Sequence, residues 1–486
     1  MRVAERRRLT AVARGAAPAD LYVRGGTLLN VYTGELYPAN VALRGERIAY
    51  VGARDDMVGA GTRVLDVAGR VLVPGYVDPH VHPAHVITPS ALARHVVALG
   101  TTTLFADTLQ FWELGGLRAF TAVADALAGS PVKFYWMIRP HAQSRTTDER
   151  RRFPLRALAR ALAHPSAVAV GEVTRWPDVH AGDADLLRRL ELALARGQRV
   201  EGHTAGASTE RLAAIAAGGL SSDHEPITAR EVLDRARQGI AVMLRESSLR
   251  PDLGDLLTAL KDAPGLAARD GRTLVDIPEP PWRRVFATPA ARLVERWRAR
   301  AEDFRLPDRP TLPVLRLVSA VITRVEERAP QPGDLHAALV DRRGRWVAPA
   351  LVAGFADRLD GLATTISTDF NILALGRRPA SLARAVNRLL DVHGGVVLVD
   401  GDEVVWELPL PLGGIMTRAS LPEAARHERE LVRHLAERGY SFHDPLFTLL
   451  FLSADFLPAA RLTPLGVWDV KAARVLLPSR RRGSAR

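Results

Sequence analysis

Histidines at the ends of apolar runs are the residues of this sequence best suited to do chemistry. His80 and His82 follow the apolar run VLVPGYV and stand two residues apart. Side chains at positions i and i+2 of a strand share one face, so both imidazoles can reach the same metal ion. His203 in EGHT and His224 in SDHE end two later runs in the same way. Because neutral imidazole is a common metal ligand, the four histidines predict a metal centre.

Two carboxylates accompany these histidines. Glu172 ends the run AVAVGEV, where its two oxygens could bridge two metal ions. Four imidazoles and one carboxylate suit Zn, Fe or Mn. Glu225, next to His224, is a candidate for moving protons to a leaving group, and it is equally well interpreted as a solvated loop residue. Each residue alone has a structural explanation, but the whole set favours metal-dependent chemistry.

The runs that carry these residues predict parallel strands alternating with helices. Seven apolar runs lie within residues 73–264, with helical patterns such as TPSALARHVVAL and STERLAAIAAG between them. In such an arrangement the carboxyl ends of the strands meet at one face, where barrel enzymes carry their chemistry. Thr88 and Ser208 are expected as helix N-caps. A closed (β/α)₈ barrel needs eight strands and about 250 residues, so the seven runs predict an α/β fold with an incomplete barrel.

The flanking sequence indicates further domains. We expect an N-terminal arm at residues 1–20 and a small antiparallel β-sandwich at residues 21–74, to which about 265–285 would contribute. The metal-binding barrel is expected at residues 75–264. Residues 300–486 combine strand patterns, such as GVVLVDG and EVVWELPLP, with helical ones, such as SLARAVNRLLD, and predict a separate α+β domain.

The composition excludes several classes of protein. Cysteine is absent, which excludes disulfides and thiolate ligands. No run approaches about 18 apolar residues, so we expect no membrane partner and a cytoplasmic location. The net charge of +12 is nearly all arginine, scattered through predicted helices. We interpret this charge as solvated surface and expect no nucleic-acid partner.

Longer motifs around these residues resemble the bacterial adenine deaminases, a family of metal-dependent amidohydrolases. VPGYVDPHVH, GEVTRWPDV, VEGHTAGAS, SSDHEPITAREVLDRARQG and LPLPLGGIMT follow in the order of that family. The resemblance covers most of the chain and implies a barrel, a small β-sandwich and a C-terminal domain. It implies a purine substrate, a homodimer, and hydrolytic deamination of adenine to hypoxanthine and ammonia. It also implies a divalent metal centre, binuclear and containing Mn or Fe, with Zn as the alternative, whose ligands are His80, His82, Glu172, His203 and His224.

The chain departs from the family pattern in three places. After His82 the family has Ile-Glu-Ser, whereas this chain has Pro-Ala-His. After the second barrel strand the family often has Asp-Pro-His-Glu, whereas this chain has Asp-Thr-Leu-Gln from Asp107. Near Gly265 the chain lacks the eighth strand, whose Thr-Asp motif supplies a metal-binding aspartate that acts as general base. Asp369, in the run TTISTDFNILALG that looks like a strand end before a helix, is the candidate substitute.

Three functions stay open at this point. The first is deamination of adenine or a related aminopurine. The second is opening of a cyclic amide by another amidohydrolase, against which count the GGIMT motif and the absence of a lysine at the position of Glu172. The third is a catalytically inactive homologue that lacks the catalytic aspartate and binds a purine or a partner subunit.

Overall fold

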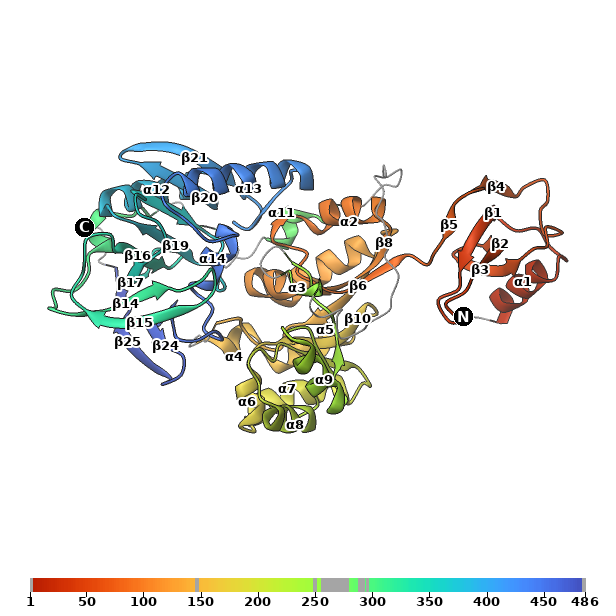
Figure 1. Ribbon diagram of the computed structural model, residues 1–486, viewed down its shortest axis with the longest axis horizontal. Helices are drawn as coiled ribbons and strands as arrows, with labels where there is room; N and C mark the ends of the chain where they lie inside the picture. The colour runs from red at the N-terminus through yellow and green to blue at the C-terminus, as the bar shows by residue number, and fades with distance from the viewer. Residues whose placement is uncertain are drawn as a thin grey trace. The chain divides into compact units, whose positions relative to one another are not determined.

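The computed structural model describes residues 3–144, 148–247, 251–254, 279–286, 293 and 297–482 (Figure 1). The chain divides into two compact units, Met1–Tyr76 and Val77–Arg486. Within the described residues, no helix combines the length and the apolar character that crossing a membrane requires.

The first unit is a five-stranded sheet with one helix. Strands β1 to β3 pair antiparallel, whereas β4 and β5 both pair parallel with β1. The sheet is therefore mixed, and the expected antiparallel pairing holds for β1 to β3 but not for β4 and β5. The residues expected to form an arm contain helix α1, whose Val12 packs into a small core with Tyr22 and Met57. Residues 255–278, which include most of the predicted later contribution, lie outside the described residues. The elements are α1 (Val3–Ala13), β1 (Leu21–Leu29), β2 (Leu36–Arg44), β3 (Arg47–Gly52), β4 (Arg63–Asp66) and β5 (Val71–Leu72).

The second unit begins with an open, curled half-barrel. Its seven strands are β6 (Tyr76–Val81), β8 (Thr101–Asp107), β9 (Lys133–Ile138), β10 (Ala167–Val173), β11 (Arg199–Gly202), β12 (Ser222–Asp223) and β13 (Ala241–Val242). The sheet order is β13-β12-β11-β10-β9-β8-β6, and the registered pairs from β8 to β13 are parallel. Within the described part of the chain, β6 and β13 form the two edges and do not pair with each other. The predicted incomplete α/β barrel is confirmed.

Helices connect these strands. The longer ones are α2 (Pro89–Ala98), α3 (Leu109–Leu127), α5 (Leu155–Leu162), α7 (Ala184–Leu194), α8 (Thr209–Ala217) and α9 (Ala229–Arg237); the short ones are α4 (Glu149–Arg152), α6 (Trp176–His180) and α11 (Trp282–Val285). Thr88 caps α2 as expected, because its hydroxyl accepts a hydrogen bond from the backbone N–H of Ala91 at 3.1 Å. Ser208 occupies the predicted N-cap position of α8. Buried aromatic and aliphatic side chains such as Phe120 and Trp136 fill the layer between strands and helices.

The C-terminal domain is built on a nine-stranded sheet of order β15-β14-β17-β16-β19-β18-β20-β21, with β26 beside β17. Alternate residues of β19 face opposite sides, so Leu373 and Leu375 pack in one core and Ile372 and Ala374 in the other. Helix α12 (Pro379–Asp391) covers the second side, and α13 (Leu421–Ala436), α14 (Pro445–Phe451) and a small β23-β24-β25 sheet contribute to the first core (Figure 1). The other elements are η1 (Ala301–Phe304), β14 (Leu312–Leu317), β15 (Thr323–Arg328), β16 (Leu335–Val340), β17 (Trp346–Ala353), β18 (Gly361–Thr364), β19 (Ile372–Gly376), β20 (Gly395–Asp400), β21 (Glu403–Pro409), β23 (Ala460–Thr463), β24 (Gly466–Asp469), β25 (Arg474–Pro478) and β26 (Arg480–Arg481).

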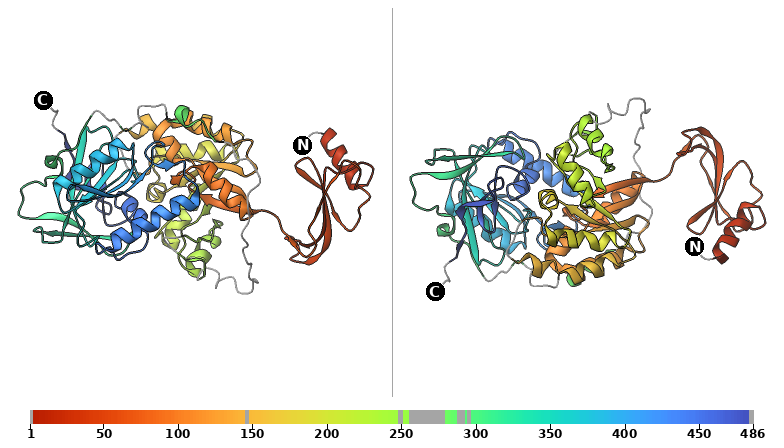
Figure 2. Two further views of the ribbon diagram at one scale, coloured as in Figure 1. Left: turned by 90° about the horizontal axis from the view of Figure 1, so that it is seen from above. Right: turned by 90° about the horizontal axis from the view of Figure 1, so that it is seen from below.

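The C-terminal domain contacts the carboxyl-end loops of the half-barrel. Strand β22 (Met416–Thr417), within the GGIMT motif, pairs with β7 (Val86–Ile87), which follows His82 by a few residues. The hydroxyl of Ser144, after β9, lies 2.8 Å from the Thr368 hydroxyl and donates to the carbonyl of Ser453 at 3.0 Å. Both views of Figure 2 show this domain, coloured cyan to blue, beside the orange and yellow strands. The loops that carry the predicted ligands are therefore supported from a distant part of the sequence.

Several arginines are buried, so the interpretation of the positive charge as solvated surface does not hold for every arginine. Arg139, Arg189, Arg235 and Arg461 are at most 3% exposed. The guanidinium of Arg235 pairs with Asp223 and donates to the carbonyl of Thr204 at 3.0 Å. Arg189 donates to the carbonyls of Pro140 and Phe153. These planar cations stabilise strand-end loops by satisfying buried carbonyls and carboxylates.

Candidate metal centre

The predicted ligands all stand at the carboxyl ends of barrel strands. His80 lies in β6 and His82 directly follows it, Glu172 lies near the end of β10, and His203 and His224 come directly after β11 and β12. Because β10, β11 and β12 are neighbours in a parallel sheet, their carboxyl ends meet at one edge. The structure brings all five of these side chains together.

His80, His82 and Glu172 form the first group of ligand atoms. The Nε2 atoms of His80 and His82 are 3.2 Å apart, and their rings meet edge to face. The Nε2 atom of His82 is 3.7 Å from Oε2 of Glu172. Within this group one ligand atom from each residue lies within 4.8 Å of the others. That spacing allows the three side chains to bind one metal ion.

Glu172 also belongs to a second group, with His203 and His224. Its Oε1 atom is 2.5 Å from Nδ1 of His203 and 3.4 Å from Nε2 of His224. The two oxygens of this one carboxylate therefore face two different sets of histidines. This is the arrangement that a bridging carboxylate requires.

A third group consists of His80, His224 and Glu201. The rings of His80 and His224 are stacked with centroids 3.8 Å apart, and Nδ1 of His224 is 2.7 Å from Oε1 of Glu201. Glu201 is not among the ligands predicted from the sequence. Its position at the end of β11, one residue from Gly202 and two from His203, places it among the ligands.

The donor set fits a divalent cation. Nitrogen and carboxylate ligands of this kind suit Zn, Fe or Mn. Buried polar atoms such as Nδ1 of His80 and Oε2 of Glu201 make no hydrogen bond, and a cation would satisfy them. Despite its burial, His224 has a pKa raised well above its ordinary value by Glu201 and Glu172. The carboxylates therefore stabilise positive charge at this position.

Asp107 and Arg139 are parts of the site that the sequence did not reveal. The string GTTTLFAD reads as a core strand, yet Oδ2 of its last residue, Asp107, is 2.9 Å from Nδ1 of His82. The buried guanidinium of Arg139 donates to Asp107 at 2.8 Å and also pairs with Glu172. Despite burial, Arg139 and His203 hold the pKa of Glu172 well below its ordinary value. The available signal was position, because Asp107 ends β8 and Arg139 follows β9, as the histidines do on other strands.

Glu225 lies beside the ligands, as expected for a proton carrier. It is 3% exposed, and its Oε1 atom is 3.6 Å from Nδ1 of His203 and 3.7 Å from Nε2 of His224. Arg245, after β13, pairs with the same carboxylate. The interpretation of Glu225 as a solvated loop residue is therefore wrong.

Asp369 lies elsewhere. It occupies the connection between strands β18 and β19, so the helix expected after it is a strand. Its carboxylate accepts hydrogen bonds from the Ser367 hydroxyl at 3.0 Å and from the Asn371 amide at 2.9 Å. Among the residues that the structure describes, no group of potential metal ligands includes Asp369 or any other aspartate. Its suggested catalytic role stays a prediction.

Two family models match the chain, one on each side of the segment near Gly265. The amidohydrolase family model matches residues 71–248, and the adenine deaminase C-terminal domain model matches residues 318–474. The first match contains the converging ligands, and the second contains the domain that supports their loops. The chain belongs to the adenine deaminase family. That family lies within the amidohydrolase superfamily, as the resemblance predicted.

Relatives within the adenine deaminase family align along nearly the whole of this chain and of their own sequences. A protein of Oceanobacillus iheyensis is 28% identical over 98% of both chains, in an alignment of 574 positions. The adenine deaminases of Nitratidesulfovibrio vulgaris and Moorella thermoacetica are each 28% identical over 95% of this chain, and 97% and 96% of their own lengths are covered. Since about 476 of this chain's 486 residues, or 98%, take part in this alignment, about 98 of the 574 positions have no counterpart in it. This shortage agrees with the sequence-based expectation that the chain lacks at least one βα unit.

Solved structures align with less of the chain. L-hydantoinase from Arthrobacter aurescens covers 46% of this chain and 58% of its own, with a TM-score of 0.34 and 15% sequence identity. N-acyl-D-glutamate deacylase from Bordetella bronchiseptica covers 47% and 58%, with a TM-score of 0.32 and 20% identity. Similarity this low carries no argument about substrate.

Proposed function

We propose that this protein is a metal-dependent hydrolase that removes the amino group of adenine to give hypoxanthine and ammonia. The single observation that carries the proposal is the convergence of four histidines, from β6, β11 and β12, on the two oxygens of Glu172. Membership of the adenine deaminase family supports adenine as the substrate.

The proposed cofactor is a pair of divalent ions, Mn or Fe, with Zn as the alternative. His80 and His82 would hold one ion and His203 and His224 the other, with Glu172 between them. When bound, such a metal lowers the pKa of water towards about 7 and supplies a nucleophile at neutral pH. Arg139 holds Glu172 in its ionised form, and Asp107 orients the ring of His82 through Nδ1.

We assign proton transfer to Glu225. Loss of ammonia requires a proton on the leaving nitrogen, and a carboxyl group within reach of the reaction can deliver it. Glu225 is buried beside His203 and His224, and its contact with Arg245 holds it at the edge of the ligand cluster. Among the described residues, Glu172 also contacts both histidines, but it belongs to the ligand groups. Glu225 contacts both histidines and belongs to none of these groups.

A small cavity beside His82 is our candidate for the base-binding pocket. Its volume is about 280 Å³, below the ~300–1,000 Å³ typical of pockets for drug-sized ligands, as suits a single heterocycle. His82 and His85 line one side, and Leu446 and Phe447 of helix α14 supply apolar surface. Glu428 of helix α13 is the carboxylate in this wall, and burial, together with Asp444, raises its pKa. The carboxylate could accept a hydrogen bond from the amino group or from a ring N–H of the base.

The test is ammonia release from adenine by purified protein loaded with Mn²⁺ or Fe²⁺. We expect turnover that disappears on removal of the metal and in a His203→Ala variant. An Arg298→Met variant, changed at an exposed ion pair with Asp391, serves as the matched control and should keep full activity. Parallel reactions with hydantoin and dihydrouracil test the cyclic-amide alternative. Opening of either ring gives a carbamoyl acid and no ammonia, so this product is measured by chromatography. Ring opening without ammonia release from adenine would contradict the proposal.

One observation favours a second candidate function, a purine-binding protein without turnover. No aspartate joins the ligand groups within the described residues, and loss of a general base costs about 10²–10⁴-fold in rate. Calorimetric titration of the metal-loaded protein with adenine separates the candidates. Binding without ammonia release supports the non-catalytic function, whereas binding with release supports the deaminase.

One further expectation comes from the family resemblance and another from the composition. We propose a homodimer and a cytoplasmic location. Light scattering during size-exclusion chromatography measures the mass, for which a chain of 52.9 kDa gives twice that value as a dimer. Fractionation of the source cells measures the location.

A further inference from the structure

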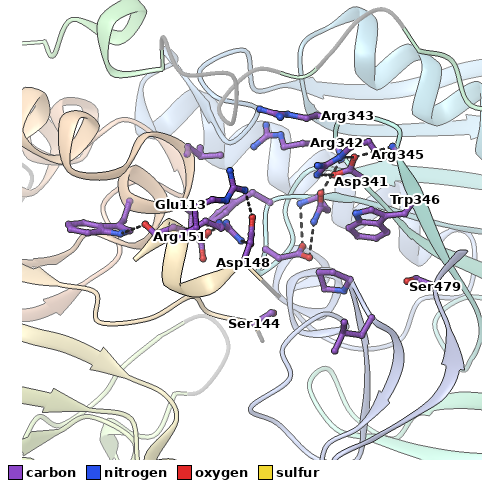
Figure 3. A pocket seen from close by; sticks show the side chains of 18 of the residues that line it. Glu113, Ser144, Asp148, Arg151, Asp341, Arg342, Arg343, Arg345, Trp346 and Ser479 are labelled. Carbon is purple, nitrogen blue, oxygen red and sulfur yellow. Dashed lines mark hydrogen bonds and ion pairs between the residues drawn. The ribbon is translucent and has the colours of Figure 1, made fainter. Parts of the chain in front are cut away.

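A larger cavity lies between the half-barrel and the C-terminal domain, apart from the metal ligands. Its volume is about 1100 Å³. Helices α3 and α4 line it from the half-barrel, and the β16–β17 turn and strand β26 line it from the C-terminal domain. Figure 3 shows Glu113, Asp148 and Arg151 on one side and Asp341, Arg345 and Trp346 across from them. None of the five predicted metal ligands borders this cavity.

The lining carries more positive than negative charge. Seven arginines and four carboxylates border the cavity. Three of the carboxylates are paired within it, Asp341 with Arg345, Asp148 with Arg151 and Glu113 with Arg152. The fourth, Asp369, accepts hydrogen bonds from Ser367 and Asn371. This leaves a surplus of arginine side chains.

Four arginines make up that surplus. One of them, Arg480, is already engaged, because its Nη2 atom donates to three backbone carbonyls at residues 302, 303 and 305. The other three are Arg342, Arg343 and Arg481. In the part of the chain that the structure describes, none of the three has a carboxylate within ion-pair distance. Arg342 is 7% exposed, and its Nη2 atom donates to the carbonyl of Gly413 at 2.8 Å. Its Nε and Nη1 atoms are buried and make no hydrogen bond. Buried guanidinium donors without acceptors are unfavourable, so this side chain is prepared for an anion.

The charges around Arg342 also favour the binding of an anion beside it. Burial, together with the neighbouring guanidinium groups of Arg343 and Arg152, lowers its pKa to about 10 even though Asp341 and Asp369 oppose the shift. The half-buried Arg343 and the exposed Arg481 line the same cavity from the β16–β17 turn and from β26. An anion beside Arg342 would relieve the repulsion that Arg343 and Arg152 exert on it.

We propose that this cavity is a binding site for a phosphate-bearing small molecule, with the phosphate held by Arg342, Arg343 and Arg481. Guanidinium groups bind phosphate through two parallel N–H···O hydrogen bonds, and a phosphate has enough oxygens for several of them at once. A single carboxylate offers two oxygens and one charge, which matches three cations less well. The half-buried ring of Trp346 provides an apolar surface for the rest of the ligand. The proposal does not depend on the deaminase activity.

The probe is inorganic pyrophosphate, titrated calorimetrically into metal-free full-length protein so that chelation of divalent ions does not contribute heat. We expect the wild-type protein to bind and Arg343→Gln and Arg481→Gln each to weaken binding about 10-fold, the loss expected for one hydrogen bond to a charged group. Arg309→Gln, changed at an exposed arginine outside the cavity, is the matched control and should bind like the wild type. His203→Ala should also bind like the wild type, because the metal centre lies elsewhere.

Arg342→Met tests the buried donor directly and should reduce binding at least 100-fold. Since that variant could fail to fold, the variants at Arg343 and Arg481 keep the proposal testable. No pyrophosphate binding by the wild-type protein would overturn the proposal. Equal binding by the wild-type, Arg343→Gln and Arg481→Gln proteins would overturn it too, as would loss of binding in His203→Ala.

Discussion

Arg139 should be one of the most important side chains for the stability of the half-barrel. It is fully buried, and its guanidinium donates to Asp107 at 2.8–3.0 Å, to Gln143 at 2.7 Å and to the Glu172 carbonyl at 3.0 Å, besides its ion pair with the Glu172 carboxylate. Replacement by Met keeps most of the volume but leaves two buried carboxylates without their cation. Breaking a buried pair in this way costs about 3–5 kcal/mol.

The loss should lie within that range because other contacts persist. Asp107 keeps its contact with His82 and Glu172 keeps its contact with His203, so the individual hydrogen bonds do not simply add. Urea unfolding of the metal-free protein, followed by tryptophan fluorescence, measures the effect. For a slope near ~3 kcal/mol per M, the midpoint should fall by about 1–2 M. Saturation with Mn²⁺ should reduce the loss, since the cation then compensates Glu172.

Two variants control this experiment. Arg298→Met removes an exposed ion pair with Asp391, at 2.8 Å, and should change stability by no more than about 0.5 kcal/mol. Arg139→Lys keeps the charge without the planar fork and should fall between the wild type and Arg139→Met. If Arg139→Met were no less stable than Arg298→Met, the argument that Arg139 compensates the carboxylates would be refuted.

Three further predictions concern the metal centre and the pockets. Mn²⁺ at 100 times its dissociation constant should raise the free energy of unfolding of the wild-type protein by about 2.7 kcal/mol, as measured by thermal unfolding. His80→Ala should abolish this stabilisation. An equal stabilisation of the variant would place the metal elsewhere. Asp369→Asn should leave Mn²⁺ affinity unchanged, because the carboxylate is bonded to Ser367 and Asn371; a tenfold weaker titration would restore Asp369 as a ligand. If adenine is turned over, Glu428→Ala should raise KM about 10-fold with little change in kcat, because the side chain lines the small cavity beside His82. Steady-state assays of ammonia release measure both constants. An unchanged KM would contradict the assignment of this cavity as the base-binding pocket.

The sequence alone determined the incomplete barrel and predicted the candidate ligands at the strand ends. The spacing of His80 and His82 follows from the two-residue period of a strand, and the other ligands share a position at the end of an apolar run. These are local signals. Because neighbouring parallel strands end at the same edge of the sheet, residues at the ends of different strands lie close together in the fold. Seven runs predicted seven strands for the same reason, and longer motifs identified the family.

Only the tertiary structure decided which charged residues surround the ligands. Arg139 and the scattered surface arginines look alike in the sequence, because burial depends on elements that are distant along the chain. Asp107 looked like the end of a core strand until its neighbours β6 and β9 placed His82 and Arg139 beside it. The same holds for Glu225, because its burial beside His203 depends on the tertiary fold. It holds also for Asp369, which lies in the β18–β19 connection and outside every described ligand group. Electrostatic partners depend on distance in space, and a local pattern carries little information about that distance.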